Sequence, residues 1–252
     1  MKPTLFLVII IAGGAFAETW TNHNGLTFSA HGWQIVQNTS KLTKIKARGG
    51  VTLGSVPDGM TITSDQLDFE AKPNPQKPKA YTLSHAYATK NVHIVKTVSS
   101  PTGKQITDVR GPLAEYSTGD IENTIRIIGP TTIQNTDLIQ HQAFTATGSS
   151  GIAYLSPSVE VSSGNGLKRA NLAGPVKVIL IQAATKTEGA SQIVATASEM
   201  QIENVGNQRR ITLTGNVHVL GPGKDEATGM SRAVIVHDPG GSWRLDAVGG
   251  KS

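Results

Sequence analysis

The chain has 252 residues, a formal net charge of +5, no cysteine and only 5% aromatic residues. The absence of cysteine excludes disulfide-stabilised folds and thiol chemistry. The basic balance favours anionic partners such as phosphates, but it lacks the aromatic and basic clustering of a nucleic-acid-binding protein.

The first 17 residues predict an export signal. Lys2 supplies a positive start, an apolar run extends from Leu5 to Ala12, and Ala15-Phe16-Ala17 fits the small-x-small cleavage rule. The apolar run is shorter than the roughly 20 residues of a membrane-spanning helix, although Gly13 to Ala17 could extend it. We therefore expect cleavage after Ala17 and a periplasmic protein, whereas an uncleaved N-terminus would act as an anchor.

Residues 18–44 are expected to form lead-in strands, and a repeat domain is expected over residues 45–246. In this domain a small residue, often glycine, precedes an alternating pattern of the Val-x-Val type about every 40 residues. The five copies begin at Gly49, Lys90, Gly129, Gly174 and Gly215. Period-two alternation predicts strands with one buried face, and a repeat of this length predicts units that must stack to bury that face.

Each unit predicts a strand with two apolar residues, a polar turn, a strand of the Ile-x-Leu type and then the Gly-x-Val-x-Val strand. In the last unit these are Ala195 to Ile202, Gly206-Asn207, Ile211 to Thr214 and Gly215 to Val219. No part of the mature chain predicts a helix of three turns. The sequence therefore predicts an elongated all-β structure with open ends, followed by a short tail at 247–252.

Two copies of the repeat carry Gly-Pro where the last copy has Gly-Asn. Pro130 and Pro175 have no backbone N–H to donate to a neighbouring strand. We therefore expect a strand start or a β-bulge at these positions.

The wording of Ala197 to Val219 is A-x-x-hydrophobic-x-hydrophobic, a short turn and I-x-L-x-G-x-V-x-V. It resembles the repeat of the OstA/LptA-type family of lipopolysaccharide-transport proteins, and the resemblance extends more loosely over about residues 45–246. It implies a twisted β-jelly-roll, a solenoid-like trough of antiparallel strand units with open edge strands. The apolar trough of such proteins carries the acyl chains of lipid A between the inner and outer membranes.

The resemblance also implies partners. Family members join end to end, and to other Lpt-type proteins at the inner and outer membranes, through their edge strands. A head-to-tail homo-oligomer is therefore expected. A retained N-terminal anchor would indicate the LptC type, which shares the fold.

Apolar positions of successive repeats are expected to line the trough and hold lipid. They are Leu67, Phe69, Val92, Ile94, Tyr116, Ile127, Tyr154, Val176, Val178, Met200, Ile202, Val217 and Val219. At about 0.8 kcal/mol per buried CH2, one acyl chain of about twelve carbons would be held strongly. The alternative is that these side chains fill one another's space, as buried apolar residues usually do.

Three cations, Lys44, Lys46 and Arg48, alternate with Ile45 and Ala47. On a strand they would lie on one face, where they could meet the phosphates of lipid A. A solvated strand face is the alternative interpretation.

No cofactor, metal or catalytic residue is expected. The seven histidines lack metal-ligand spacing, and no nucleophile elbow is present. We expect His93 and His218, which share one slot of the repeat, to point away from the interior. Two other classes remain open: an extracellular β-solenoid enzyme acting on acidic polysaccharide through Asp65 and Asp68, and a structural envelope repeat protein.

Overall fold

The computed structural model describes residues 18–21, 25–74, 81–100, 103–138, 142–157, 166–184, 189–205, 208–222, 225–239 and 241–248. The expected export signal at 1–17, the expected turn at 206–207 and residues 249–252 lie outside the described residues.

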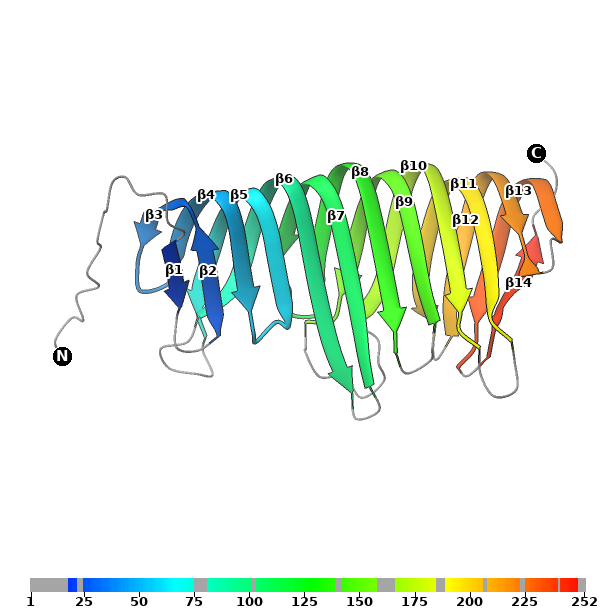
Figure 1. The fold of residues 1–252 in the computed structure, drawn as a ribbon, viewed down its shortest axis with the longest axis horizontal. Helices are drawn as coiled ribbons and strands as arrows, with labels where there is room; N and C mark the ends of the chain where they lie inside the picture. The colour runs from blue at the N-terminus through cyan, green and yellow to red at the C-terminus, as the bar shows by residue number, and fades with distance from the viewer. Residues whose placement is uncertain are drawn as a thin grey trace.

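One antiparallel sheet of 14 strands runs through the described residues, and strands adjacent in sequence are neighbours in space (Figure 1). The strands are β1 (Glu18–Thr21), β2 (Leu26–Ala30), β3 (Gly32–Asn38), β4 (Thr43–Ser55), β5 (Met60–Pro73), β6 (Tyr81–Ser100), β7 (Gly103–Ser117), β8 (Asn123–Asp137), β9 (Gln142–Leu155), β10 (Leu167–Gln182), β11 (Ser191–Val205), β12 (Gln208–Leu220), β13 (Glu226–His237) and β14 (Trp243–Val248). The one departure from sequential order is at β4, which pairs with both β2 and β3. The expected elongated all-β trough with open edge strands is confirmed, because β1 and β14 lie at opposite ends and each pairs with one neighbour.

Element boundaries differ slightly from those expected. β4 begins two residues before the expected start of the repeat domain at residue 45, and β14 ends two residues after its expected end at residue 246. The regular sheet therefore includes Lys44 and part of the expected tail.

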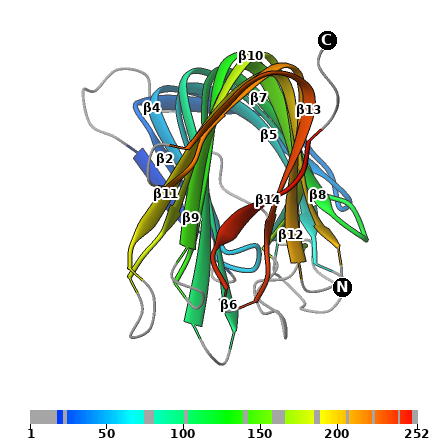
Figure 2. The same cartoon turned by 90° about the vertical axis from the view of Figure 1, so that its right-hand side faces the viewer.

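The long strands bend near their middles, and the bends form one ridge along the molecule, at the top of the arch in Figure 2. At the start of each repeat phrase the backbone has positive φ: 82° at Gly49, 62° at Lys90, 96° at Gly129, 85° at Gly174 and 75° at Gly215. The strand pairing shifts register at the same places, which marks β-bulges. The repeat phrase is therefore the bulge that folds β4, β6, β8, β10 and β12 over the ridge.

The bulges correct one prediction. Separate strands were expected before and after the glycine of each phrase, but β12 runs through Gly215 without interruption, from Ile211 to Val219 and beyond. A bulge bends a strand while its hydrogen-bonded ladder continues on both sides, so one long strand replaces two short ones.

The Gly-Pro copies are accommodated in the same way. Register shifts between Ile128 and Thr131, and between Ala173 and Val176, leave Pro130 and Pro175 outside the paired positions. The expected bulge is confirmed, because neither proline has to donate a ladder hydrogen bond.

The ridge divides the sheet into two walls, which descend on either side of it (Figure 2). Wall A comprises residues 43–48, 66–73, 81–89, 113–117, 123–128, 150–155, 167–173, 199–205, 208–214 and 232–237. Wall B comprises residues 51–55, 60–64, 92–100, 103–110, 131–137, 142–147, 176–182, 191–196, 217–220 and 226–230. β2 continues wall B, and β3 and β14 continue wall A.

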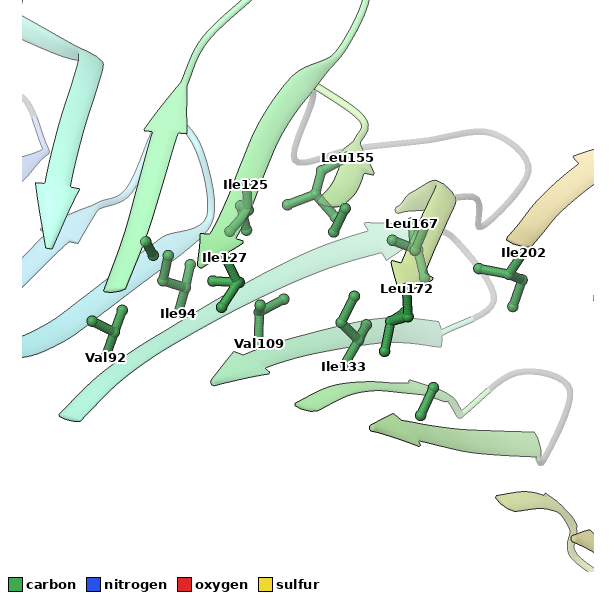
Figure 3. Close-up of a cluster of buried hydrophobic side chains, with 14 of the residues drawn as sticks. Val92, Ile94, Val109, Ile125, Ile127, Ile133, Leu155, Leu167, Leu172 and Ile202 are labelled. Atoms are coloured by element: carbon green, nitrogen blue, oxygen red, sulfur yellow. The ribbon is translucent and has the colours of Figure 1, made fainter. Parts of the chain in front are cut away.

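A single hydrophobic core fills the space between the walls along the sheet. In Figure 3, Val109 and Ile133 of wall B point into the same space as Ile127 and Leu172 of wall A. These four side chains are at most 2% exposed. The alternation expected from the sequence therefore places an apolar face on the inner side of both walls.

Candidate functional site

The inner face of wall B is apolar close to the ridge. Strand register aligns one inward residue from each successive strand into a row parallel to the ridge. From β6 to β12 this row is Ile94, Val109, Ile133, Ala146, Val178, Ala195 and Val219. All seven side chains are buried, so the top of the trough is lined by hydrocarbon.

Further from the ridge, polar residues enter the same face. The row two positions down each strand has Lys96, Thr107 and Asn135 on β6 to β8, but apolar Phe144, Leu180 and Ile193 on β9 to β11. Two positions further down, the next row includes Gln105, Asp137, Gln142 and Gln182. The seven polar residues of these two rows are at most 4% exposed. The lower row lies at the edge opposite the ridge, which we call the mouth.

Wall A is apolar to a greater depth, but it too carries polar residues at the mouth. Arg209, His237 and Trp243 are register partners on β12, β13 and β14. Their side chains are buried, and β14 lies between the two walls at the C-terminal end of the trough (Figure 2). Asn123, on β8, donates a hydrogen bond of 2.9 Å to Tyr116 Oη.

Contacts between polar groups join the walls across the mouth. Arg209 Nη1 donates to Asn135 Oδ1 at 2.8 Å. His237 Nε2 lies 3.1 Å from Gln182 Oε1, and the backbone N–H of Gly166 donates to Gln105 Oε1 at 2.6 Å. The walls are thus continuous backbone at the ridge, whereas hydrogen bonds from side chains connect them at the mouth.

The mouth holds buried cationic groups. Burial lowers the pKa of Arg209 to about 10, against the attraction of Asp137. Burial, and then the positive charge of Arg209, lowers the pKa of His237 below its ordinary value. Lys96, in the N-terminal half, donates to the carbonyl oxygen of Asp58 at 2.7 Å; burial lowers the Lys96 pKa and raises the Asp58 pKa.

We expect the His237 environment to make stability depend on pH. Because the folded pKa is depressed, the unfolded chain takes up a proton near pH 6.5 before the folded chain does. The free energy of unfolding should therefore fall as pH falls through this range and level off below the folded pKa. Asp137 and Asp238 oppose the shift, and Arg209 reinforces it.

Urea unfolding of the wild type and His237→Gln at several values between about pH 7.5 and about pH 5 measures this effect. The wild type should lose more stability over the range than the variant does. Parallel curves for the two proteins would contradict the assignment to His237.

Twelve of the thirteen residues expected to line the trough are buried in its interior: Leu67, Phe69, Val92, Ile94, Tyr116, Ile127, Val176, Val178, Met200, Ile202, Val217 and Val219. In this structure they pack against one another. Whether they also hold lipid stays a prediction.

Tyr154 is the exception, because it lies on the outer face. The Arg169 guanidinium sits 3.8 Å from the centre of its ring, and Arg169 pairs with Glu122 at 2.6 Å outside the trough. Its neighbours Ala153 and Leu155 are the buried residues. Ile152 and Tyr154 are larger than Ala153 and Leu155, so alternation of apolar residues alone predicted the wrong pair to point inward.

The three cations Lys44, Lys46 and Arg48 share the outer face of β4, on which each has a partner from β5. Lys44 pairs with Glu70 at 2.5 Å and Lys46 with Asp68 at 3.7 Å, and Arg48 donates to Gln66 at 2.6 Å. The common face is confirmed. Phosphate binding there stays a prediction, and it now requires the phosphate to compete with Glu70 and Asp68.

The groups considered for other chemistry also lie outside the trough. Asp65 accepts hydrogen bonds from Asn91 at 3.3 and 3.2 Å, separately from the Asp68 pair. His93 and His218 face outward as expected, His93 at 2.8 Å from Asp108 and His218 at 2.7 Å from Glu226. The described residues contain no cluster of His, Asp and Glu suited to a metal ion.

Sequence reasoning did not place the mouth residues inside the trough, although a signal was present. Arg209 lies on the same face of its strand as Ile211 and Leu213, and Gln182 on the same face as Val178 and Leu180. Extending the alternation to the strand ends would have placed these polar residues inside.

Within the described part of the chain, no helix is long and apolar enough to cross a membrane. Comparison with protein-family models, curated proteins and solved structures gives no match. The functional interpretation therefore depends on the geometry of the trough and on the amino-acid pattern of the repeat.

Proposed function

We propose that the protein binds lipopolysaccharide in the trough and bridges its transport across the periplasm to the outer membrane. The observation that carries this proposal is the layering of the interior, which is apolar near the ridge and polar at the mouth. An amphiphile has the same layering, with acyl chains for the apolar rows and a polar headgroup for the mouth.

Loading would occur by parting of the walls at the mouth. A hydrogen bond between neutral groups contributes about 0.5–1.5 kcal/mol, and one from a charged donor such as Arg209 about 1.5–3 kcal/mol. Each CH2 removed from water contributes about 0.8 kcal/mol, so an acyl chain with many CH2 groups outweighs the few bonds across the mouth. The acyl chains would replace the contacts that the two walls now make with each other, while the ridge keeps the sheet intact.

The ends of the sheet suit a bridge. β1 and β14 each have one edge without a neighbouring strand among the described residues. Such edges pair readily with a strand of another chain, either a second copy or a transport partner with the same fold. Joined end to end, the troughs would form one continuous apolar track.

A cross-link across the mouth tests the proposal. The chain has no cysteine, so Gln182→Cys with His237→Cys introduces a unique pair on opposite walls. Joining the pair with a short, reducible bis-maleimide should lower lipopolysaccharide affinity by more than about tenfold. Reduction of the linker should restore binding in the same protein.

The matched control is Gln201→Cys with Thr212→Cys, register partners on one wall whose side chains point outward. Cross-linking this pair should leave affinity unchanged. Full binding by the protein clamped across the mouth would contradict loading through it. Mass spectrometry of lipid retained by the native protein would identify the cargo, and a structural repeat protein would retain none.

A further inference from the structure

We infer that Arg209 is the anion-binding residue of the mouth, and that it takes a phosphate or carboxylate on the headgroup of an amphiphile. The inference rests on the proposed function, since it assigns a headgroup site in the same trough. It also specifies the ligand class, because it requires a negative charge next to the acyl chains.

The guanidinium of Arg209 is held almost entirely by neutral groups. It donates to Asn204 Oδ1 at 3.2 Å and to Asn135 Oδ1 at 2.8 Å, and it lies 5.9 Å from the centre of the Phe144 ring. It forms no ion pair with a carboxylate of the described residues, and it is only 6% exposed. A guanidinium offers five donors in a planar fork, so two amide oxygens leave much of its capacity unused.

The carboxylate that attracts Arg209 is on the opposite wall. Asp137 attracts Arg209 electrostatically, but its carboxylate accepts a hydrogen bond of 2.8 Å from Gln105, also on wall B. Asn135 and Phe144 belong to wall B as well. When the walls part, Arg209 stays with Asn204 on wall A and loses these partners together, so an anion is needed to replace them.

Lys96, the buried cation of wall B, keeps its counter-charge when the walls part. It stays close to Asp58, which lies in the hairpin between β4 and β5 on the same wall, and whose carboxylate is fixed by Ser55. Opening of the mouth does not separate Lys96 from this counter-charge. Opening of the mouth therefore separates Arg209, but not Lys96, from its counter-charge.

A donor without an acceptor lies on the same row as Arg209. Trp243 is 4% exposed, and its indole Nε1–H has no hydrogen-bond partner in the described structure. Its ring lies 5.0 Å from that of His237, the register partner of Arg209. Buried donors are usually satisfied, so the indole N–H is free to bind an acceptor oxygen of a ligand. A phosphorylated headgroup would supply several.

The test compares dodecyl phosphate with dodecyl maltoside below micelle-forming concentrations, with inorganic phosphate alone as a third probe. The wild type should bind dodecyl phosphate more tightly than dodecyl maltoside. Arg209→Gln should weaken dodecyl phosphate binding by about 10-fold to 100-fold, as expected for a charge-assisted hydrogen bond, and leave dodecyl maltoside binding nearly unchanged. Arg209→Lys should restore most of the preference.

Arg210→Gln is the matched control, because Arg210 is adjacent on β12 and does not share the inward phase of Arg209. It should keep the wild-type preference. If neither detergent binds the wild type, the proposed function fails. If both bind equally, the trough binds amphiphiles but the assignment of Arg209 is overturned, whether or not Arg209→Gln folds.

Inorganic phosphate separates the two possible sources of the anion. It should bind far more weakly than dodecyl phosphate, because it cannot use the apolar rows. Equal affinity for the two would indicate a site for free phosphate and would overturn the headgroup assignment.

Discussion

Replacement of Gly174 with alanine is expected to lower the free energy of unfolding by about 2–4 kcal/mol. Gly174 forms the ridge bulge of β10 with φ of 85°, a conformation that costs an L-residue about 1–2 kcal/mol. An added Cβ would also lie 2.7 Å from Ser149 Cβ and 3.3 Å from the Ser149 backbone N. Relief of this clash requires the β9 bulge to shift, because the backbone of β9 contributes to it.

Two other glycines separate the backbone effect from the clash. Gly229 has φ of 67° with no atom within 4 Å of an added Cβ, and Gly189 has neither constraint. Gly229→Ala should therefore cost about 1–2 kcal/mol and Gly189→Ala about zero. Urea unfolding monitored by circular dichroism measures the series. An equal effect at all three positions would contradict the role assigned to the ridge.

Leu213→Ala is expected to lower the free energy of unfolding by about 2–5 kcal/mol. Leu213 is fully buried on wall A, in the last inward position of β12 before the ridge. Truncation removes its packing and leaves a cavity that two stiff walls cannot easily close. Thermal or urea unfolding of the purified variant measures the loss.

Leu220→Ala is the control on the same strand, since Leu220 is 39% exposed. It should cost less than about 1 kcal/mol, as is usual for substitutions at the surface. A similar loss for both leucines would show that the interior is not the main source of stability. A small loss for both would indicate that the walls move together easily and close the cavity left by the truncation.

Much of the fold could be predicted because its signal is local. Alternation of apolar residues marks each strand and its buried face, as in Ile211-Thr212-Leu213. Each 40-residue repeat corresponds to one pair of long antiparallel strands, and glycine marks the position where the backbone must adopt positive φ. Twelve of the thirteen predicted interior residues are buried for this reason.

Local signals were insufficient where a bulge changes the phase. In β9 the inward residues run from Ala146 to Gly151 across the ridge, an odd step that exchanges the two faces. Tyr154 therefore lies outside, although its size and the preceding pattern suggested the interior. The step is decided by how β9 aligns with β8 and β10, which the sequence of β9 does not contain.

The sequence by itself determined that this chain forms strands with one apolar face, that the strands repeat, and where the glycine-rich phrases interrupt them. Only the tertiary structure decided that each phrase folds a single strand over a ridge, and that the strand ends meet as a polar mouth. Arg209 and Asn135 illustrate the reason: 74 residues separate them in the chain, yet a 2.8 Å hydrogen bond joins them. Alternation describes neighbours along a strand, whereas the mouth depends on two walls brought together by every bulge between them.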